Sequence, residues 1–423
     1  MNRWKITGLL IMVVALAIAG SSAVAKVVRF GDANLEEAIR EAIFVPRGGL
    51  NDYDLAWLTE FDASSRDIEV LDGIEYCTSL RWLALDGNQI TDLGPVSELA
   101  LLSSLSAKDN AIDRLPNMDD LTALLKLNLD GNRIDDLSAL EPLIQLETLR
   151  VEGNPIQNLS PLRSLTRLTE LWVSCEAGCN LNPLHPLTSL RSLVVDTPGQ
   201  IDLTILGAME DLASLRLVSV SISDYTPLQQ LSSLVEFRLI GVEIDSLVKI
   251  VDNAPDLQVL ALESMAIDDF EPMTELSKLS TLRLVDVEFS DLGLLFDFPD
   301  LAMVYLPENG LSDVGVLGAL DGLLALDLNG NDVRNIRPIS SLIRLRLLDI
   351  SGNPVEDIDV LHTLDELQVL RLRGTQVTEI SVLTGLTKLI LVDLRDLSLD
   401  LSTGSPSSAV VRMLRDRGVT VLL

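Results

Sequence analysis

The stretch Leu80–Leu101, LRWLALDGNQITDLGPVSELAL, carries a pattern that recurs along nearly the whole sequence. The general frame is L-x-x-L-x-L-x-x-N-x-I-x-D-L-x-P-L-x-x-L-x-x, and further clear copies begin at Leu124, Leu323 and Leu345. Self-similarity at a fixed period of this length predicts a solenoid, in which stacked units bury one continuous core. Because a solenoid presents a long surface, the repeat indicates the kind of work that the protein does better than any single residue.

The first leucine of the frame sets the register of the units. Every step is 22 residues except the step from Leu234 to Leu257, which is 23. This spacing predicts fifteen whole units over residues 58–388 and leaves little room for an inserted domain. The units begin at Leu58, Leu80, Leu102, Leu124, Leu146, Leu168, Leu190, Leu212, Leu234, Leu257, Leu279, Leu301, Leu323, Leu345 and Leu367, and a partial unit begins at Leu389.

Each position of the frame has a structural role. The second and third leucines, such as Leu83 and Leu85, alternate with polar residues and predict a short strand with its leucines inward. Equivalent strands should pair in parallel, about 4.8 Å apart. Proline in the returning arm suits the first turn of a short 3₁₀ helix. The asparagine after the strand can bond the backbone at the turn, so stacked copies predict a ladder of Asn88, Asn110, Asn132 and Asn154, then Asn309, Asn331 and Asn353.

These residues resemble the bacterial leucine-rich repeat proteins of the internalin type, which have 22-residue units. The resemblance covers Leu58 to the C-terminus and extends to the N-terminal cap. It implies an α/β solenoid shaped as a horseshoe, with a parallel β-sheet on the concave face and short 3₁₀ or helical return arms on the convex face. It also implies binding of other proteins, without indicating a particular ligand.

Both ends of the solenoid carry sequences that predict caps, which cover the leucines of the outermost units. Residues 26–57 predict a helical N-terminal cap, with a capped amphipathic helix over 32–43 and a second helix over 50–58. A degenerate first strand follows over 58–65. Residues 389–423 predict a partial repeat and a C-terminal cap, in which Gly418 ends a helix over Pro406–Asp416 and a strand follows.

Residues 1–25 predict a Sec-type signal peptide. Arg3 and Lys5 precede the apolar run Ile6–Ala19, and Ala23-Val24-Ala25 supplies a cleavage site. The run is shorter than the roughly 20 residues that a transmembrane helix needs, so cleavage is favoured over an uncleaved anchor. We therefore expect a secreted or periplasmic protein that does not insert into the membrane after cleavage.

The protein is strongly acidic. Loss of Arg3 and Lys5 with the signal would change its formal net charge from −31 to −33. Such a surface disfavours nucleic acid and anionic membranes as partners, because both are polyanions. The charge also keeps a long, rather apolar molecule in solution.

The middle of the solenoid departs from the frame. Over six consecutive units the ladder asparagine is replaced by Glu176, Pro198, Val220, Val242, Met265 and Val287. An aliphatic group is unable to bond the backbone of the turn, so water or a different turn must do so. Two interpretations stay open, which are drift without function and a changed curvature suited to one ligand.

The outward residues of the strands form the predicted concave face. One column of this face runs Asp62, Ala84, Ser106, Asn128, Arg150, Trp172, Val194, Arg216, Arg238, Ala261, Arg283, Tyr305, Asp327, Asp349, Arg371 and Asp393, and neighbouring columns add Trp82, Glu170, Glu236, Glu263, Val218, Ile240, Val285, Met303 and Pro307. Arginine, tryptophan and tyrosine are enriched at binding hot spots, and exposed aliphatics on a sheet suggest a covered surface. The candidate partner-binding residues are therefore Arg150, Trp172, Arg216, Arg238, Arg283 and Tyr305. Alternatively, carboxylates such as Glu170, Glu236 and Glu263 neutralise the arginines and the aliphatics are incidental.

Three further groups of residues bear on metals, redox state and catalysis. An aspartate recurs just before the leucine of the return arm. Together these aspartates form either a solvated acidic edge or, less favourably, a row that attracts Ca²⁺. They are Asp92, Asp136, Asp202, Asp224, Asp269, Asp291, Asp313 and Asp357. Cys175 and Cys179 are either a short-range disulfide or two free thiols, Cys77 is expected to be buried and free, and zinc is disfavoured. His185 and His362 lie eight units apart and cannot act together. No Ser or Cys nucleophile can be matched with a His base through the frame, so we predict no catalytic, metal or cofactor-binding residue.

These patterns favour a non-enzymatic, monomeric scaffold that recognises a protein ligand through its concave face. Two functions of other classes remain as alternatives. One is a structural envelope or matrix protein that self-associates or binds polysaccharide, which gel filtration would distinguish by size. The other is a carbohydrate-processing enzyme using concave carboxylates such as Asp327 and Asp349, which glycan hydrolysis assays would reveal.

Overall fold

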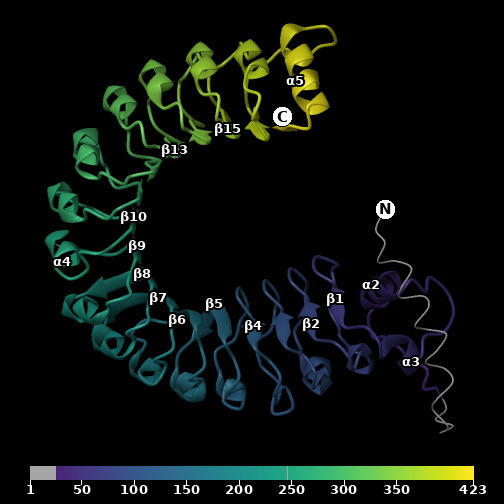
Figure 1. The fold of residues 1–423 in the computed structure, drawn as a ribbon. Helices are drawn as coiled ribbons and strands as arrows, with labels where there is room; N and C mark the ends of the chain where they lie inside the picture. The colour runs from purple at the N-terminus through teal and green to yellow at the C-terminus, as the bar shows by residue number, and fades with distance from the viewer. Residues whose placement is uncertain (1–24, 245) are drawn as a thin grey trace.

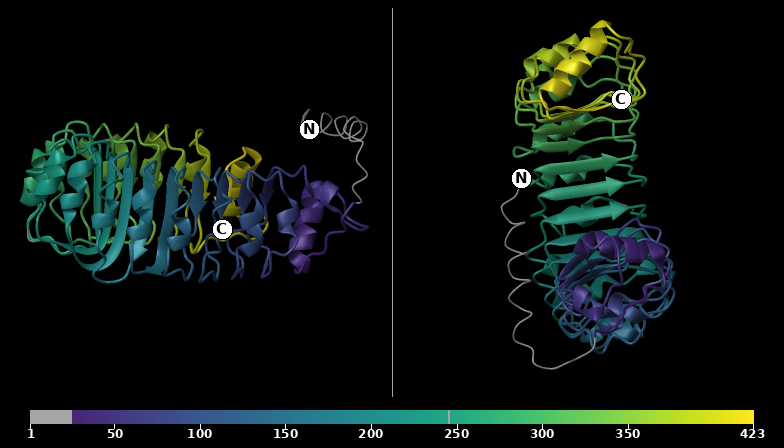
Figure 2. Two further views of the ribbon diagram at one scale, coloured as in Figure 1. Left: turned by 90° about the horizontal axis from the view of Figure 1, so that it is seen from below. Right: turned by 90° about the vertical axis from the view of Figure 1, so that its right-hand side faces the viewer.

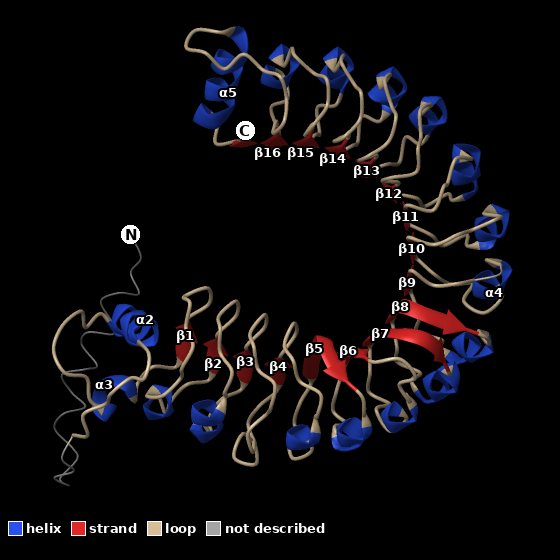
Figure 3. Cartoon of the chain, turned by 180° about the vertical axis from the view of Figure 1, so that it is seen from behind, coloured by secondary structure: helices blue, strands red, loops and turns tan. Residues whose placement is uncertain are grey.

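The computed structural model describes residues 25–244 and 246–423, and the predicted signal peptide lies outside this range apart from Ala25. The described residues form a horseshoe whose inner wall is a single 17-stranded sheet (Figure 1). Short helices lie along the outer wall, and the strands lie side by side across the inner one (Figures 2 and 3). The predicted leucine-rich repeat horseshoe is thus confirmed.

All neighbouring strands pair in parallel, and equivalent positions of successive units lie opposite one another. Leu83 pairs with Leu105, for example, and Leu326 with Leu348, both one unit apart. The strands are β1 (Glu60–Asp62), β2 (Trp82–Ala84), β3 (Ser104–Ser106), β4 (Lys126–Asn128), β5 (Thr148–Ile156), β6 (Glu170–Cys175), β7 (Ser192–Ile201), β8 (Ser214–Ile222), β9 (Glu236–Ile240), β10 (Val259–Glu263), β11 (Thr281–Val285), β12 (Met303–Tyr305), β13 (Ala325–Asp327), β14 (Leu347–Asp349), β15 (Val369–Arg371), β16 (Leu391–Asp393) and β17 (Thr420–Leu422).

Most of the returning arms form 3₁₀ helices, as their short length and their prolines predict, but the arm between β3 and β4 forms none. Pro95 and Pro161, among others, occupy the first turn, where a missing N–H leaves no bond unmade. The 3₁₀ helices are η3 (Ile74–Tyr76), η4 (Gly94–Glu98), η5 (Ser138–Leu140), η6 (Ser160–Ser164), η7 (Asn182–Leu184), η8 (Leu203–Ala208), η9 (Thr226–Gln230), η10 (Glu271–Glu275), η11 (Leu292–Asp297), η12 (Gly315–Ala319), η13 (Arg337–Ser341), η14 (Asp359–Thr363) and η15 (Ser381–Thr384). The unit with the extra residue instead carries a short α-helix, α4 (Val248–Val251).

The two ends of the solenoid are closed by helices. Helix α2 (Ala33–Ile43) is capped by Asp32 and buries one apolar face, including Leu35 and Ile39. The second N-terminal helix, α3 (Asp52–Leu55), is shorter than predicted, because the capping box of Asn51 delays its start and the backbone must turn into β1. At the other end, α5 spans Pro406–Asp416 as predicted and β17 completes the sheet.

The predicted asparagine ladder supports both flanks of the horseshoe. Asn132 donates to the carbonyl oxygens of Ala107 and Leu129, at 3.0 and 2.9 Å, and its Oδ1 accepts from the backbone N–H of Ile112. Asn331 repeats this arrangement with Leu306, Leu328 and Leu311 in the other flank. Each buried amide therefore joins its own turn to the preceding unit.

In the units of β7 and β8, longer strands replace the ladder. Strand β7 continues past the usual turn, and its residues Gly199, Gln200 and Ile201 pair with β8 at Val220, Ser221 and Ile222. The backbone groups that an asparagine would bond are thus bonded by another strand. The different turn expected from the sequence is an extended second strand segment, which frees the asparagine position for buried side chains such as Val220.

Candidate binding face

The predicted concave column is continuous in the structure. Strand register places Arg150 beside Trp172, Val194 beside Arg216, and Arg283 beside Tyr305. Arg238 lies between Arg216 and Ala261 in the same row. The six candidate residues therefore share one face of the sheet, from β5 to β12, and they divide into two groups with different surroundings.

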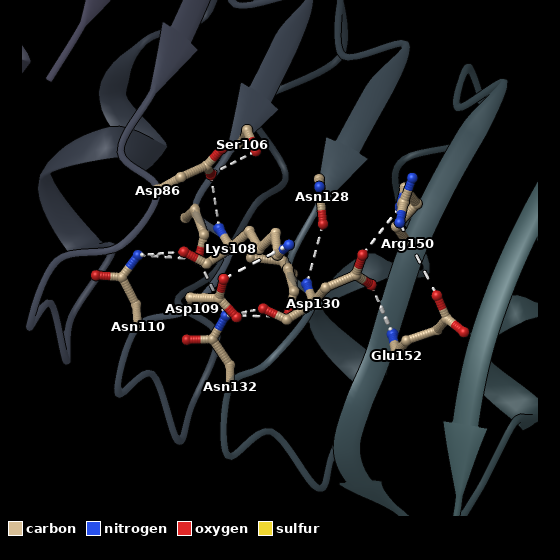
Figure 4. A network of polar contacts seen from close by, with 12 residues as sticks. Asp86, Ser106, Lys108, Asp109, Asn110, Asn128, Asp130, Asn132, Arg150 and Glu152 are labelled. Atoms are coloured by element: carbon tan, nitrogen blue, oxygen red, sulfur yellow. Dashed lines mark hydrogen bonds and ion pairs between the residues drawn. The ribbon is translucent and has the colours of Figure 1, made fainter. Parts of the chain in front are cut away.

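The first group is Arg150 with Trp172, and neighbouring side chains hold it in place. Arg150 Nε lies 2.9 Å from Asp130 Oδ2, while Asp130 Oδ1 accepts from the backbone N–H of Glu152 at 2.7 Å (Figure 4). The guanidinium carbon lies 3.5 Å from the centre of the Trp172 ring, which is cation–π geometry. Arg150 thus covers one face of the indole, so this arginine buttresses the tryptophan as well as facing the concave side.

Figure 4 also shows that polar contacts run from unit to unit at this end of the strands. Asp86 Oδ1 accepts from Ser106 Oγ at 2.6 Å and from the backbone N–H of Lys108 at 2.9 Å. Burial raises the pKa of Glu152, and the charge of Asp130 raises it further, whereas Arg216 and Arg150 act in the opposite direction. These polar residues stabilise the wall next to the candidate face.

The second group surrounds an open hollow of 530 Å³ on the concave side. Arg216, Arg238, Arg283 and Tyr305 line it together with acidic and apolar side chains. Arg238 Nε lies 2.5 Å from Glu236 Oε1, and Arg283 Nε lies 2.8 Å from Glu263 Oε1. Arg283 also lies over the Tyr305 ring, 5.8 Å from its centre. Two of the carboxylates expected to neutralise the arginines therefore do so in part, through the Nε atoms.

The face is less exposed than strict alternation predicts. Val194 and Ala261 point outward from the sheet but are only 4% and 1% exposed, and Pro307 is also buried. A concave sheet brings outward side chains toward one another, so large neighbours such as Trp172 and Arg216 cover the small ones. Met303 remains 39% exposed and supplies apolar surface at the hollow.

The aspartates at the acidic end of the column form hydrogen bonds within the sheet and its turns. Asp327 Oδ1 accepts from the backbone N–H of Asn329, and Asp349 Oδ1 from that of Ser351, both at 2.9 Å. Burial raises the pKa of Asp327, and the hydrogen bond from Arg395 lowers the pKa of Asp393. Asp327 and Asp349 are thus bonded to the turns that follow their strands.

The recurring aspartates have a role that the sequence interpretation missed. Each accepts a hydrogen bond from the backbone N–H two residues later, as Asp92 does from Gly94 at 2.7 Å and Asp313 from Gly315 at 2.8 Å. They cap the entry to the 3₁₀ turns, and the recurrence of aspartate at one position of the frame could have indicated this, because aspartate side chains commonly bond the backbone two residues on. Within residues 25–244 and 246–423, no three His, Cys, Asp or Glu side chains are grouped to hold a metal ion.

The cysteines lie where the unit starting at Leu168 loses the usual turn. Cys175 and Cys179 are joined by a disulfide with a Cα–Cα distance of 6.0 Å. Cys77 is a free, fully buried thiol, and burial raises its pKa to about 12. Counting thiols in the denatured, unreduced protein checks the bridge, which predicts one free thiol. Three thiols would contradict it.

Two further features lie away from the concave face. His185 and His362 are exposed, at η7 and within η14 on the outer wall. None of the helices among the described residues is long and apolar enough to cross a membrane.

The architecture described above matches known structures. A leucine-rich repeat protein of Leptospira interrogans has 22% identity and a TM-score of 0.55, over 88% of this chain and 97% of the other. The chain has the leucine-rich repeat fold. An internalin F of Listeria monocytogenes has 25% identity and a TM-score of 0.41, over 93% of this chain and 95% of the other. Internalin C2 of the same species has 26% identity and a TM-score of 0.42, over 63% of this chain and 100% of the other. No protein-family model matches the sequence, and no functionally curated protein does.

Proposed function

We propose that this leucine-rich repeat protein is an exported, non-enzymatic scaffold that binds a protein partner through its concave face. The observation that carries the proposal is the unbroken register of the concave column from Arg150 in β5 to Tyr305 in β12. This register presents arginine, tryptophan and tyrosine on one surface, and these residue types dominate binding hot spots.

The mechanism is rigid presentation. Asp130 and Trp172 hold Arg150, and the carboxylates of Glu236 and Glu263 orient Arg238 and Arg283. A side chain that is already ordered loses little conformational entropy when a partner binds. The sheet beneath these side chains is continuous, so their spacing is also fixed before binding.

The proposal of export rests on the signal-peptide sequence of residues 1–25. In the exported protein, the N-terminal cap spans residues 26–57, the repeats span 58–388, and the partial repeat with the C-terminal cap spans 389–423. The short-range Cys175–Cys179 bridge fits an oxidising compartment. We propose that the exported form is a monomer without a cofactor.

Affinity capture from the native extracellular fraction tests the binding face. The full mature protein and a Trp172→Ala/Tyr305→Ala variant serve as baits, and mass spectrometry identifies what each retains. We expect the variant to lose the partner that the wild type retains, because it lacks both aromatic anchors. A His185→Ala/His362→Ala variant is the matched control, since both residues are exposed on the outer wall. Equal capture by the folded aromatic variant would exclude the proposed face.

A further inference from the structure

One arginine of the concave column makes no hydrogen bond or ion pair with a carboxylate of the described residues. Arg150, Arg238, Arg283 and Arg371 each contact a carboxylate within 3.4 Å. Arg216 makes no hydrogen bond or ion pair with any residue that the structure describes, and its Nε is buried. A buried N–H group without an acceptor is unfavourable, so Arg216 has hydrogen-bonding capacity that the sheet does not satisfy.

The neighbour of Arg216 increases this imbalance. Strand register places Arg216 directly beside Arg238 on adjacent parallel strands, which lie about 4.8 Å apart. Like charges in such a cross-strand pair repel and destabilise the sheet. Glu236 occupies the Nε side of Arg238 and sits on that arginine's own strand. Glu152 interacts with the charge of Arg216, but the two side chains form no ion pair. An anion received between the two guanidinium groups would relieve their repulsion.

The surroundings of the pair indicate what carries the anion. Ile240, Val259 and Met303 line the same hollow as the two arginines, so an apolar group of the ligand can pack beside the charged one. The hollow of 530 Å³ accommodates a few side chains of a peptide. A long polyanion is disfavoured, because the rest of a protein with a net charge of −31 would repel each additional phosphate.

We propose that Arg216 and Arg238 form a carboxylate-binding site for a peptide segment of the partner in which an acidic group neighbours an apolar side chain. The proposal rests on the proposed function of the concave face and specifies its ligand. Each guanidinium can offer two N–H groups to a carboxylate in a planar, charge-assisted arrangement. The carboxylate is supplied either by an Asp or Glu side chain or by the C-terminus of the partner.

Selection from peptide libraries tests the site without knowledge of the natural partner. Random heptapeptides are displayed with free C-termini in one library and with internal placement in another, and both are selected on the immobilised mature protein. We expect enriched peptides to contain a carboxylate next to an aliphatic or aromatic residue. Enrichment of a terminal carboxylate in the first library alone would assign the C-terminus as its source, whereas Asp or Glu in both would assign the side chain.

Variants locate the binding of the enriched peptides. We expect Arg216→Gln and Arg238→Gln each to weaken it by about tenfold or more, since each removes one half of a charge-assisted contact. Arg371→Gln removes an arginine of the same column beyond the hollow and should leave affinity unchanged. Arg216→Gln should not lower the melting temperature, because it relieves the repulsion with Arg238, so loss of binding through misfolding is detectable.

The outcomes separate this inference from the function on which it rests. Neutral or basic peptides whose binding needs Trp172 and Tyr305 but tolerates Arg216→Gln would overturn the carboxylate site and retain the binding face. Peptides that bind independently of all these residues, or no enrichment at all, would overturn both.

Discussion

The flanks and the middle of the horseshoe satisfy the same backbone groups in different ways. In the flanks, buried asparagines such as Asn132 and Asn331 bond the turn after each strand and the carbonyl groups of the preceding unit. In the middle, strands β7 and β8 continue and pair with each other through the same region. The units of β7 and β8 keep the 22-residue step of the flanks, because strand pairing also satisfies the backbone of the turn.

The difference shows what a ladder requires. Each asparagine amide reaches into the preceding unit, so a ladder works only where neighbouring turns share one conformation. Where strands pair instead, the position becomes apolar and the outward surface changes with it. The arginines of the hollow lie on strands β8, β9 and β11, in the region without the ladder. These arginines therefore lie within the departure from the repeat, whereas Arg150 and Tyr305, at the two ends of the candidate face, lie in units that keep Asn154 and Asn309.

The largest expected effect comes from removing an asparagine from a flank. Asn331→Val should lower the free energy of unfolding by about 3 kcal/mol, because it leaves several buried backbone groups without partners. Asn331 is 4% exposed, and its Oδ1 accepts from the N–H groups of Asn309 and Leu311. Chemical denaturation measures the loss, and hydrogen exchange should report it locally at these two amides. A change below about 1 kcal/mol would refute the structural role of the ladder.

The reciprocal substitution tests the middle. Val220→Asn should destabilise the protein by about 2 kcal/mol, since it buries an amide where strand pairing has already satisfied the backbone. Val220 is 1% exposed and pairs with Gly199. Ser219→Asn is the matched control, because Ser219 is exposed with a φ of 59°, a conformation that asparagine tolerates. A stable Val220→Asn protein would indicate that the middle can adopt the ladder turn after all.

The sequence predicted the fold well because each recurring spacing in the frame has one physical explanation. Leucine alternation determined the inner strands, and the concave column agrees with the observed register residue by residue. The helix over Pro406–Asp416 was predicted with its observed bounds, since Pro406 can start it and Gly418 can end it. Local signals of this kind need no knowledge of the neighbouring units.

The surroundings of the candidate face could not be predicted in the same way. Absence of asparagine at Val220 indicated that the ladder stops, but not that paired strands replace it. The charge balance of Arg216 depends on which carboxylates reach it from adjacent strands, and those side chains are 20 or more residues away in sequence. Arg150 pairs with Asp130 at this separation, whereas Arg216 forms no ion pair with a described residue. Such differences depend on side-chain packing between units.

A smaller effect is expected where the second ladder begins. Glu308 adopts a φ of 59° immediately before Asn309, whereas Gly330 and Gly352 occupy the equivalent positions with a φ of 67°. Glu308→Gly should raise the free energy of unfolding by about 0.5–1 kcal/mol, because only glycine adopts this conformation without a steric cost. Thermal denaturation measures the gain. Glu308→Ala keeps the steric cost and is the control, so equal stabilisation by alanine would contradict the backbone explanation.

The smallest effect concerns Glu152, where the first ladder gives way to the middle. Its pKa is raised in the folded state by burial and by the charge of Asp130, so folding favours the protonated form. The contribution of Glu152 to stability should therefore become more favourable as the pH falls through its folded pKa, and Glu152→Gln lacks this contribution. Consequently, the advantage of Glu152→Gln should be greatest at pH 7 and decrease toward pH 4. Melting temperatures across this range test the sign, and exposed Glu141→Gln sets the baseline for removing one negative charge. An advantage that grows toward pH 4 would mean that the Arg150 and Arg216 charges outweigh burial at this junction.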